Sequence, residues 1–513
     1  MNDLQTAGHY HRCYREKATV NYIIGGYRGL EFMDITGGDD HYRHNWVRGT
    51  CQYGIMPANG LSYMPPHSCG CYMESKIFGF VTLANSRPSW DLTTTAPRLE
   101  PGPAYGTVAV TDSYAGEWPT FRYDSRRSAT TVNPLPTTAS IQWQTDVGGK
   151  LSAATVADDK VLMADITGHR IVALDAIDGN LLWSYTAGGR IDSPPTAYNG
   201  MVFFGSNDGY VYNLALSDGR LIWRFRAAPV PLYAMAQGNV ESIWPVHGSI
   251  LVQNDTIYFA VGRSSYLDEG IHIYGLNPQT GAIQYSTQRT SIHAGVDTST
   301  DDGLGAIAIT QNIEDYKTRT HPDYSDAFSM AGGVISDVLS GDGASVYMKS
   351  LQFDNNLVEQ AEKKAHYFST SSVLDGEENH RSHAIYGTGD FSRTTVAYSW
   401  IVYNPNNWGD CAIGVPFGLK LAFNDNKIWG VLRGTSYKKY VSNYKYVLYS
   451  KDLGSYSGPD FESPGDAYTF DWQQNIEMRA RAMLCAGSYI YGSSQEFVQA
   501  NYDENIISVY FTA

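Results

Sequence analysis

The sequence predicts an all-β fold built as a β-propeller, and two copies of one forty-residue unit carry the prediction. The copies read VLMADITGHRIVALDAIDGNLLW at 161–183 and MVFFGSNDGYVYNLALSDGRLIW at 201–223. Each contains an apolar strand, a polar turn, an alternating strand, an Asp-Gly turn and a last strand that ends in Trp. Several short strands repeated at about this period are typical of propeller blades.

The composition agrees with many short strands joined by turns. The 513 residues include 50 Gly and 38 Tyr, and only 17% are charged. Gly supplies turn positions with positive φ, and Tyr suits a half-buried pleated surface. The net charge of −15 argues against a nucleic-acid partner, which needs clustered Lys and Arg. No run is apolar enough to predict a membrane span, and the chain as given opens without the pattern of a secretory signal.

Strand patterns along the rest of the chain predict seven or eight four-stranded blades. We expect N-terminal blades with a Cys-rich loop in residues 1–85, a Pro-rich linker or long loop in residues 86–117, and the remaining blades in residues 118–513. A looser copy of the unit lies at 256–286 and has Tyr285 in the Trp position.

The tryptophans give this architecture a form that a structure can check. Trp143 precedes the first clear copy of the unit, Trp183 ends it, and Trp223 ends the second copy. We expect the three indoles in equivalent positions between neighbouring blades.

The segment ALDAIDGNLLW at 173–183 resembles the tryptophan-docking repeat of the pyrroloquinoline-quinone (PQQ) propeller superfamily. In that family the Trp of one blade packs against the Gly-containing turn of its neighbour, and members include quinoprotein alcohol dehydrogenases and an outer-membrane assembly lipoprotein. The resemblance is strong over 138–286, and WPTFRYDSRRS at 118–128 is similar to the lead-in to the first blade. It implies a propeller of the quinoprotein-like type and a periplasmic or extracellular location.

Four further segments look like parts of large PQQ-like proteins of planctomycete-type bacteria. They lie at 11–19, 45–80, 261–271 and 380–387. These segments imply a family and a fold rather than a reaction.

One departure from that family concerns its cofactor. Quinoprotein dehydrogenases carry adjacent cysteines beneath the quinone, and no Cys-Cys pair occurs in this chain. The cofactor also needs a Ca²⁺ site made of carboxylate and amide oxygens, with a nearby Asp base. The sequence reveals no such set, so we expect no tightly bound PQQ.

A cysteine-rich loop is the most suggestive metal candidate. His67, Cys69 and Cys71 lie on one loop, and Cys51 precedes them on what we expect to be a neighbouring segment. Thiolate and imidazole ligands suit Zn²⁺ or Cu⁺. The alternatives are free thiols, or a disulfide between Cys51 and either Cys69 or Cys71, and we favour these two together over a metal.

Arginines and tyrosines recur near turns in the family-like segments and could line a ligand-binding face. The ligand-binding candidates are Arg12, Arg48, Arg263, Tyr266 and Asp268. Guanidinium groups gathered on one face would bind carboxylate or sulfate, as in an anionic polysaccharide. The structural alternative, which we favour, is that the arginines satisfy strand-end carbonyls and the tyrosines pack between blades.

His380, Arg381 and Tyr386 form the best local set for catalysis. A polysaccharide lyase would need a His or Tyr base and an Arg that neutralises the uronate carboxylate. Asp268, in contrast, is expected to serve a turn, and the isolated Cys411 and Cys485 are expected to be small core residues.

Three functions therefore compete. The leading hypothesis is a PQQ-like propeller that binds a ligand, such as an anionic glycan, or a protein partner at one face. The alternatives are a lyase-like carbohydrate-active enzyme and a quinoprotein dehydrogenase. Fold alone does not decide between them, because propellers host unrelated functions.

Overall fold

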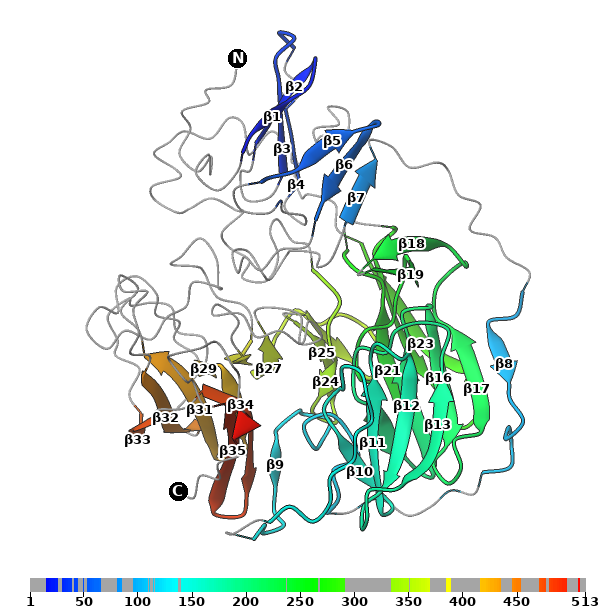
Figure 1. Cartoon of the computed structure of the whole chain (residues 1–513), viewed down its shortest axis with the longest axis vertical. Helices are drawn as coiled ribbons and strands as arrows, with labels where there is room; N and C mark the ends of the chain where they lie inside the picture. Colours follow the sequence, from blue (N-terminus) through cyan, green and yellow to red (C-terminus); the bar gives the residue numbers. More distant parts are fainter. Residues whose placement is uncertain are drawn as a thin grey trace.

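A computed structural model of the chain shows an all-β architecture, and the part of the chain that it describes contains no helix (Figure 1). The described residues are 15–25, 30–38, 41–44, 49, 53–65, 81–84, 96–108, 110, 114, 116–136, 140–236, 238–265, 268–290, 334–349, 351–369, 384–388, 416–434, 445–453, 470–476, 479–495 and 506–507.

The two clear sequence repeats form consecutive antiparallel sheets, here called blade A and blade B, and the looser copy forms blade C. Blade A contains β10 (Thr155–Ala157), β11 (Lys160–Asp165), β12 (Arg170–Asp175) and β13 (Leu181–Thr186). Blade B contains β14 (Thr196–Tyr198), β15 (Met201–Gly205), β16 (Tyr210–Ala215) and β17 (Leu221–Arg226), with β8 (Leu99–Pro101) as a fifth strand. Blade C contains β20 (Leu251–Gln253), β21 (Thr256–Val261), β22 (Ile271–Leu276) and β23 (Ile283–Arg289).

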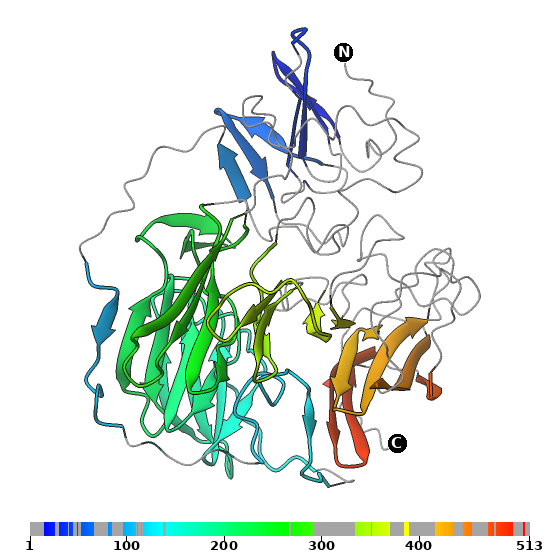
Figure 2. The same ribbon diagram turned by 180° about the vertical axis from the view of Figure 1, so that it is seen from behind.

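Four more sheets follow along the chain. Blade D contains β24 (Ser340–Gly341), β25 (Ser345–Met348) and β26 (Leu351–Asp354), and blade E contains β27 (His366–Ser369), β28 (Ala384–Gly387) and β29 (Phe417–Gly418). Blade F contains β30 (Lys420–Phe423), β31 (Lys427–Gly434), β32 (Lys445–Asp452) and β33 (Trp472–Ile476). Blade G contains β34 (Arg479–Ala486), β35 (Tyr489–Gln495), β36 (Ile506–Ile507) and β9 (Thr130–Thr131). In Figures 1 and 2 blades A to C lie on one side of the propeller and blades F and G on the other. Among the described residues blades D and E have three strands each, and the total number of blades stays a prediction.

The repeated turns explain why the same unit folds the same way each time. The first hairpins of blades A and B turn at Asp158-Asp159 and Asn199-Gly200, where both residues have positive φ. Two such residues make the type I′ turn that suits the twist of a hairpin, and Asn, Asp and Gly tolerate that conformation best. The second strands of blades A and B have continuous apolar centres, VLMA in β11 and MVFFG in β15, because each blade is covered on both faces.

The tryptophan prediction is confirmed. The indole Nε1 atoms of Trp143, Trp183 and Trp223 donate hydrogen bonds to carbonyl oxygens of the next blade, at 3.0, 3.0 and 3.1 Å. The acceptors are Ala176, Leu216 and Pro278. Each ring lies against the turn glycine of the following unit, where an added Cβ would come within 2.4, 2.6 and 3.1 Å of the indole at Gly179, Gly219 and Gly281, respectively. Tyr285 opposes Gly275 in blade C as Trp223 opposes Asn213 in blade B, so it takes the expected Trp position.

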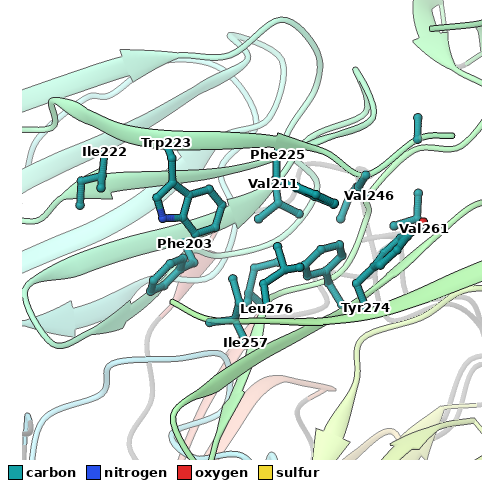
Figure 3. Close-up of a cluster of buried hydrophobic side chains, with 14 of the residues drawn as sticks. Phe203, Val211, Ile222, Trp223, Phe225, Val246, Ile257, Val261, Tyr274 and Leu276 are labelled. Atoms are coloured by element: carbon teal, nitrogen blue, oxygen red, sulfur yellow. The ribbon is translucent and has the colours of Figure 1, made fainter. Parts of the chain in front are cut away.

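The largest buried cluster lies between blades B and C (Figure 3). Trp223 and Phe225 from β17 pack beside Phe203, and Tyr274 of blade C lies 5.7 Å from Phe225 between ring centroids. Offset and edge-to-face aromatic pairs of this kind add to the burial of apolar area. Stability therefore arises mainly at the seams between blades.

Residues 118–131 run past the first strands of several blades and form backbone hydrogen bonds with them. Arg127 is almost completely buried and donates to the carbonyl oxygens of Leu339 at 3.0 Å and Phe121 at 3.1 Å, and to Thr120 Oγ1 at 2.8 Å. Burial lowers the pKa of Arg127 to about 10. The segment ends in β9, which pairs in parallel with β34 and so joins the beginning of the propeller to its last blade.

Two further sheets precede the propeller strands in the sequence, and a separate hairpin lies between two of the blades. They contain β1 (Lys17–Ala18), β2 (Tyr22–Gly25), β3 (Leu30–Asp34) and β4 (His41–His44), and β5 (Met56–Ala58), β6 (Leu61–Met64) and β7 (Val81–Ala84). The two sheets share a small core of Ile24, Ile55 and Met64. The hairpin consists of β18 (Tyr233–Ala236) and β19 (Asn239–Ser242) and lies in the crossing from blade B to blade C.

Candidate functional site

One face of the propeller carries the crossings between blades and the turns that join the two middle strands of each blade; we call it the loop face. Charged and polar side chains from blades A to D gather here in the buried parts of these loops. They are Arg190, Asp192, Asn207, Glu241, His247, Arg263, Asp337 and Lys349.

Asp192 is the centre of the first group. Its carboxylate lies 2.6 Å from Arg190 Nε and 2.8 Å from His247 Nδ1, and the Asn207 amide donates to it at 3.0 Å. Burial alone would raise the pKa of Asp192, but the His247 hydrogen bond and the Arg190 charge outweigh it and lower the pKa to about 2. The carboxylate is therefore ionised and fully engaged.

Glu241 forms the second group with Arg263. Arg263 Nη2 donates to Glu241 Oε2 at 3.1 Å, and Glu241 Oε1 lies 3.9 Å from Arg190 Nε. Burial lowers the pKa of Arg263, and the Glu241 charge opposes that shift. Glu241 belongs to β19, so this ion pair fixes the β18–β19 hairpin to blade C.

Lys349 and Asp337 form a third buried pair in blade D, with 2.5 Å between Nζ and Oδ2. The same ammonium donates to the Ser369 carbonyl at 3.0 Å and so connects blade D to blade E. Such pairs are costly to break, because removing one partner leaves a buried charge uncompensated.

The opposite side of the hairpin is apolar and exposed. Tyr233, Met235 and Val240 are 53, 61 and 63% exposed. Met235 opposes Val240 across the two strands, and Tyr233 is two residues from Met235 on the same face. The loop face thus presents a small apolar patch on one side of the hairpin, while Glu241 on the other side binds Arg263.

The structure places three of the predicted site residues. Arg263 lies on the loop face but is committed to Glu241. Asp268 lies in a turn with φ of 52°, as expected from the sequence, and its carbonyl accepts a hydrogen bond from Trp244 Nε1 at 2.6 Å. Tyr386 lies in β28 and packs on Phe423 with 4.8 Å between ring centroids.

The remaining candidates lie outside the described residues. These are Arg12, Arg48, Tyr266, His380 and Arg381, together with Cys51, His67, Cys69 and Cys71 of the predicted metal or disulfide loop. Their convergence stays a prediction. Within the described ranges no group of three or more His, Cys, Asp or Glu residues is arranged to hold a metal ion. Cys485 is a buried free thiol in the core of blades F and G, as predicted, and burial raises its pKa to about 11.

Sequence reasoning missed Arg190, Asp192, Glu241 and His247. For Arg190 and Asp192 a signal was present. They are the two charged residues of GGRIDSPP at 188–195, the crossing between the two clear repeats, where the neighbours are mostly Gly, Ser and Pro. Glu241 and His247 gave no such signal, since only the fold brings their crossing beside the first one.

The fold class raises the question of a quinone held with Ca²⁺. Asn207 Oδ1 and Glu241 Oε1 are buried acceptors without a hydrogen bond, and amide and carboxylate oxygens are what Ca²⁺ takes. Both Glu241 and Asp192 are, however, paired with guanidinium groups, which would repel a divalent cation at contact distance. The described residues of this face do not fit a Ca²⁺–quinone site.

The repeat, the tryptophan docking and the consecutive blades define a β-propeller of the PQQ-like repeat class. The model of the family described as outer membrane protein assembly factor BamB matches residues 129–308. The chain is 34% identical over 90 residues to BamB of Burkholderia pseudomallei, covering 18% of this chain and 23% of the relative. It is 25% identical over 159 residues to BamB of Nitrosomonas eutropha, covering 31% and 36%, and 30% identical over 127 residues to BamB of Escherichia coli, covering 21% and 32%. The matches thus span about a third or less of these curated relatives.

Solved structures of the same general fold are more distant. Quinohemoprotein alcohol dehydrogenase from Comamonas testosteroni is 10% identical, with 74% of this chain and 70% of that chain covered and a TM-score of 0.43. BamB from Moraxella catarrhalis is 10% identical, with 69% and 83% covered and a TM-score of 0.35. No helix in the described part of the chain could cross a membrane.

Proposed function

We propose that this PQQ-like propeller is a binding protein that docks a partner protein on its loop face, in the bacterial envelope, without tightly bound quinone. The observation that carries the proposal is the β18–β19 hairpin. Its outer side exposes Tyr233, Met235 and Val240, and its inner side is fixed by the buried Glu241–Arg263 pair. A rigid apolar patch with an aromatic residue is the kind of surface that anchors protein interfaces.

The pairing of charges on the loop face supports a binding role over catalysis. The carboxylates of Asp192 and Glu241 are buried and paired with arginines, so neither has the open approach that a general base needs. Arg263, which could have bound an anionic glycan, is occupied in the same way. The matching relatives are named for outer-membrane protein assembly, which favours a protein partner and a periplasmic location.

Site-specific photocrosslinking tests the partner half of the proposal. A photoreactive amino acid at Met235, in the full chain expressed in a Gram-negative host, should give a discrete crosslinked protein. The same amino acid at Val358, which is 57% exposed elsewhere on the propeller, is the matched control and should not give that product. Identical products at both sites, or none at Met235, would overturn this role for the hairpin.

Reconstitution tests the cofactor half. The purified chain is mixed with PQQ and Ca²⁺, passed through a desalting column, and assayed for quinone absorbance and dye-linked alcohol oxidation. We expect neither retained quinone nor turnover. Stoichiometric retention with turnover would instead establish a dehydrogenase.

A further inference from the structure

The outer edge of blade B is occupied by a segment from far earlier in the chain. Residues 96–108, here called the strap, cross the edge of β17, and β8 pairs antiparallel with it. Gly102 N donates to Ile222 O at 2.7 Å, and Arg226 N donates to Arg98 O at 2.7 Å. The sequence predicted only a linker here, because β8 has just three residues among prolines.

Side-chain contacts with blades B and C reinforce the backbone pairing of the strap. Glu100 accepts two hydrogen bonds from Arg224, at 2.8 and 2.6 Å. The Arg98 guanidinium carbon lies 4.8 Å from the Phe225 ring centroid and 4.9 Å from that of Tyr274. Leu99 covers the docked Trp223 at Gly281, and Trp223 is 0% exposed.

Blade A has the same repeat, but its outer edge carries no strand among the described residues. β13 is the edge strand of its sheet, whereas β17 pairs with β8 on its outer side. Leu181 and Leu182 are 58 and 46% exposed, while Ile222, which corresponds to Leu182, is buried beneath the strap. Ile141 and Ile177 beside this edge are also exposed, and the Gln142 side chain donates to the Ile177 carbonyl.

The positions that select the strap at β17 differ at β13. Ser184 stands where blade B has Arg224, so β13 offers no cation to an acidic residue. At the seam between blades A and B, the aromatic pair equivalent to Phe225 and Tyr274 is Tyr185 and Tyr212, with 5.8 Å between centroids. Arg224 of blade B lies beside this pair, in the way that Arg98 of the strap lies beside Phe225 and Tyr274. A segment docked on β13 would therefore not need an arginine at the position of Arg98.

We propose that the outer edge of β13 is a docking site for an extended, uncharged, apolar segment of a partner protein, which adds to blade A as β8 adds to blade B. The backbone of β13 would form the hydrogen bonds of an antiparallel strand pair with the segment. Leu182 and the exposed edge of the Trp183 ring would contact an apolar side chain of that segment. A row of free strand-edge groups flanked by exposed apolar residues is the surface that strand addition uses. This site lies on the edge of a blade and is independent of the hairpin on the loop face.

The test uses two fluorescein-labelled peptides and fluorescence anisotropy with the full chain. The first peptide has the sequence of residues 96–104 with threonine in place of both Arg98 and Glu100, and the second has the native strap sequence. We expect saturable binding of the neutral peptide to the wild type. The native strap should outcompete both peptides at β17, because a tethered segment has an effective concentration in the millimolar range.

Variants at Ser184 identify the edge. Ser184→Pro removes the N–H that corresponds to the strap-bonded N–H of Arg224, and an edge strand tolerates Pro. It should weaken neutral-peptide binding by about tenfold or more, while the matched control Ser184→Ala should change it by less than about twofold. Ser184→Arg should raise the affinity for the native-sequence peptide by about tenfold, because it recreates the partner of Glu100. Circular dichroism confirms that all variants fold.

Three results would overturn the proposal. One is the absence of saturable binding of the neutral peptide to the wild type. Another is equal binding by the Ser184→Pro and Ser184→Ala variants. The third is a concentration-dependent dimer in sedimentation velocity that Ser184→Pro abolishes, because the edge would then serve a second copy of this chain.

Discussion

Tryptophan docking between blades makes a quantitative prediction for three matched positions. Truncation of Trp183 to Ala removes an indole that is 8% exposed, and large-to-small changes of this kind cost about 3 to 5 kcal/mol. Trp223, which is fully buried, should lie at the upper end of that range. Trp143 is only half-buried and should cost less than either.

Substitution by Phe isolates the indole hydrogen bond. Trp183→Phe removes the donor to the Leu216 carbonyl and should cost about 1 kcal/mol for the bond, in addition to a small packing loss. Trp223→Phe should lose less through its hydrogen bond, because the Pro278 carbonyl also accepts from the Asn213 amide at 3.0 Å. The carbonyl would keep one partner after the change.

Urea denaturation followed by circular dichroism measures these differences. Trp472→Phe is the control, since Trp472 lies 37% exposed on the edge strand of blade F, and it should shift stability by less than about 0.5 kcal/mol. The docking argument would be wrong if Trp183→Phe and Trp472→Phe behaved alike, or if truncation of Trp143 cost more than truncation of Trp223.

Three other predictions follow from the described geometry. Gly219→Ala should destabilise the chain by about 2 kcal/mol or more in the same urea assay, because Gly219 has φ of 71° and its added Cβ would lie 2.6 Å from the Trp183 ring; an unchanged midpoint would contradict that contact. Burial and then the nearby Arg98 lower the pKa of His272 to about 4, so the neutral ring contributes stability that is complete above the unfolded value of about 6.5 and is lost as the pH falls toward 4. A pH series should show up to about 2 kcal/mol of loss in that window after solvent screening, and His272→Gln should flatten it relative to the wild type. Arg127→Met should cost about 3 kcal/mol, since it leaves the Leu339 and Phe121 carbonyls without this donor, and equal thermal midpoints for variant and wild type would contradict a stabilising role of these hydrogen bonds.

Local features made the fold predictable. The Asp-Gly turns, the terminal Trp of each unit and the forty-residue spacing are all written within short stretches, so the sequence alone indicated the blades and the docking of Trp183 and Trp223. Even Tyr285 could be placed in register from its distance to Gly281. The strap was not predictable, because β8 is specified by its partner strand 124 residues later, as the Glu100–Arg224 contact shows.

The loop face was harder to predict for the same reason. Arg263 was proposed as a ligand-binding residue from its family-like segment, yet its role depends on Glu241 in a different crossing. Single charged residues in turns carry no sequence pattern, and their pairing is decided by which loops the fold brings together. The predictions for the cysteine loop and for His380 and Arg381 lie outside the described residues and stay predictions.

The parallel pairing of β9 with β34 sets a time order for biosynthesis. Nearby, Tyr491 donates a hydrogen bond to the Leu135 carbonyl, 356 residues earlier in the chain. A ribosome adding about 5 to 20 residues per second needs roughly 20 to 70 s to make the intervening length. During that interval the first blades can pack on one another, but β9 lacks its partner strand β34 and its backbone groups stay accessible to chaperones or to other nascent chains. Synthesis of blade G supplies the partner strand β34, so the contact between residues 118–131 and blade G forms after the first blades have been made.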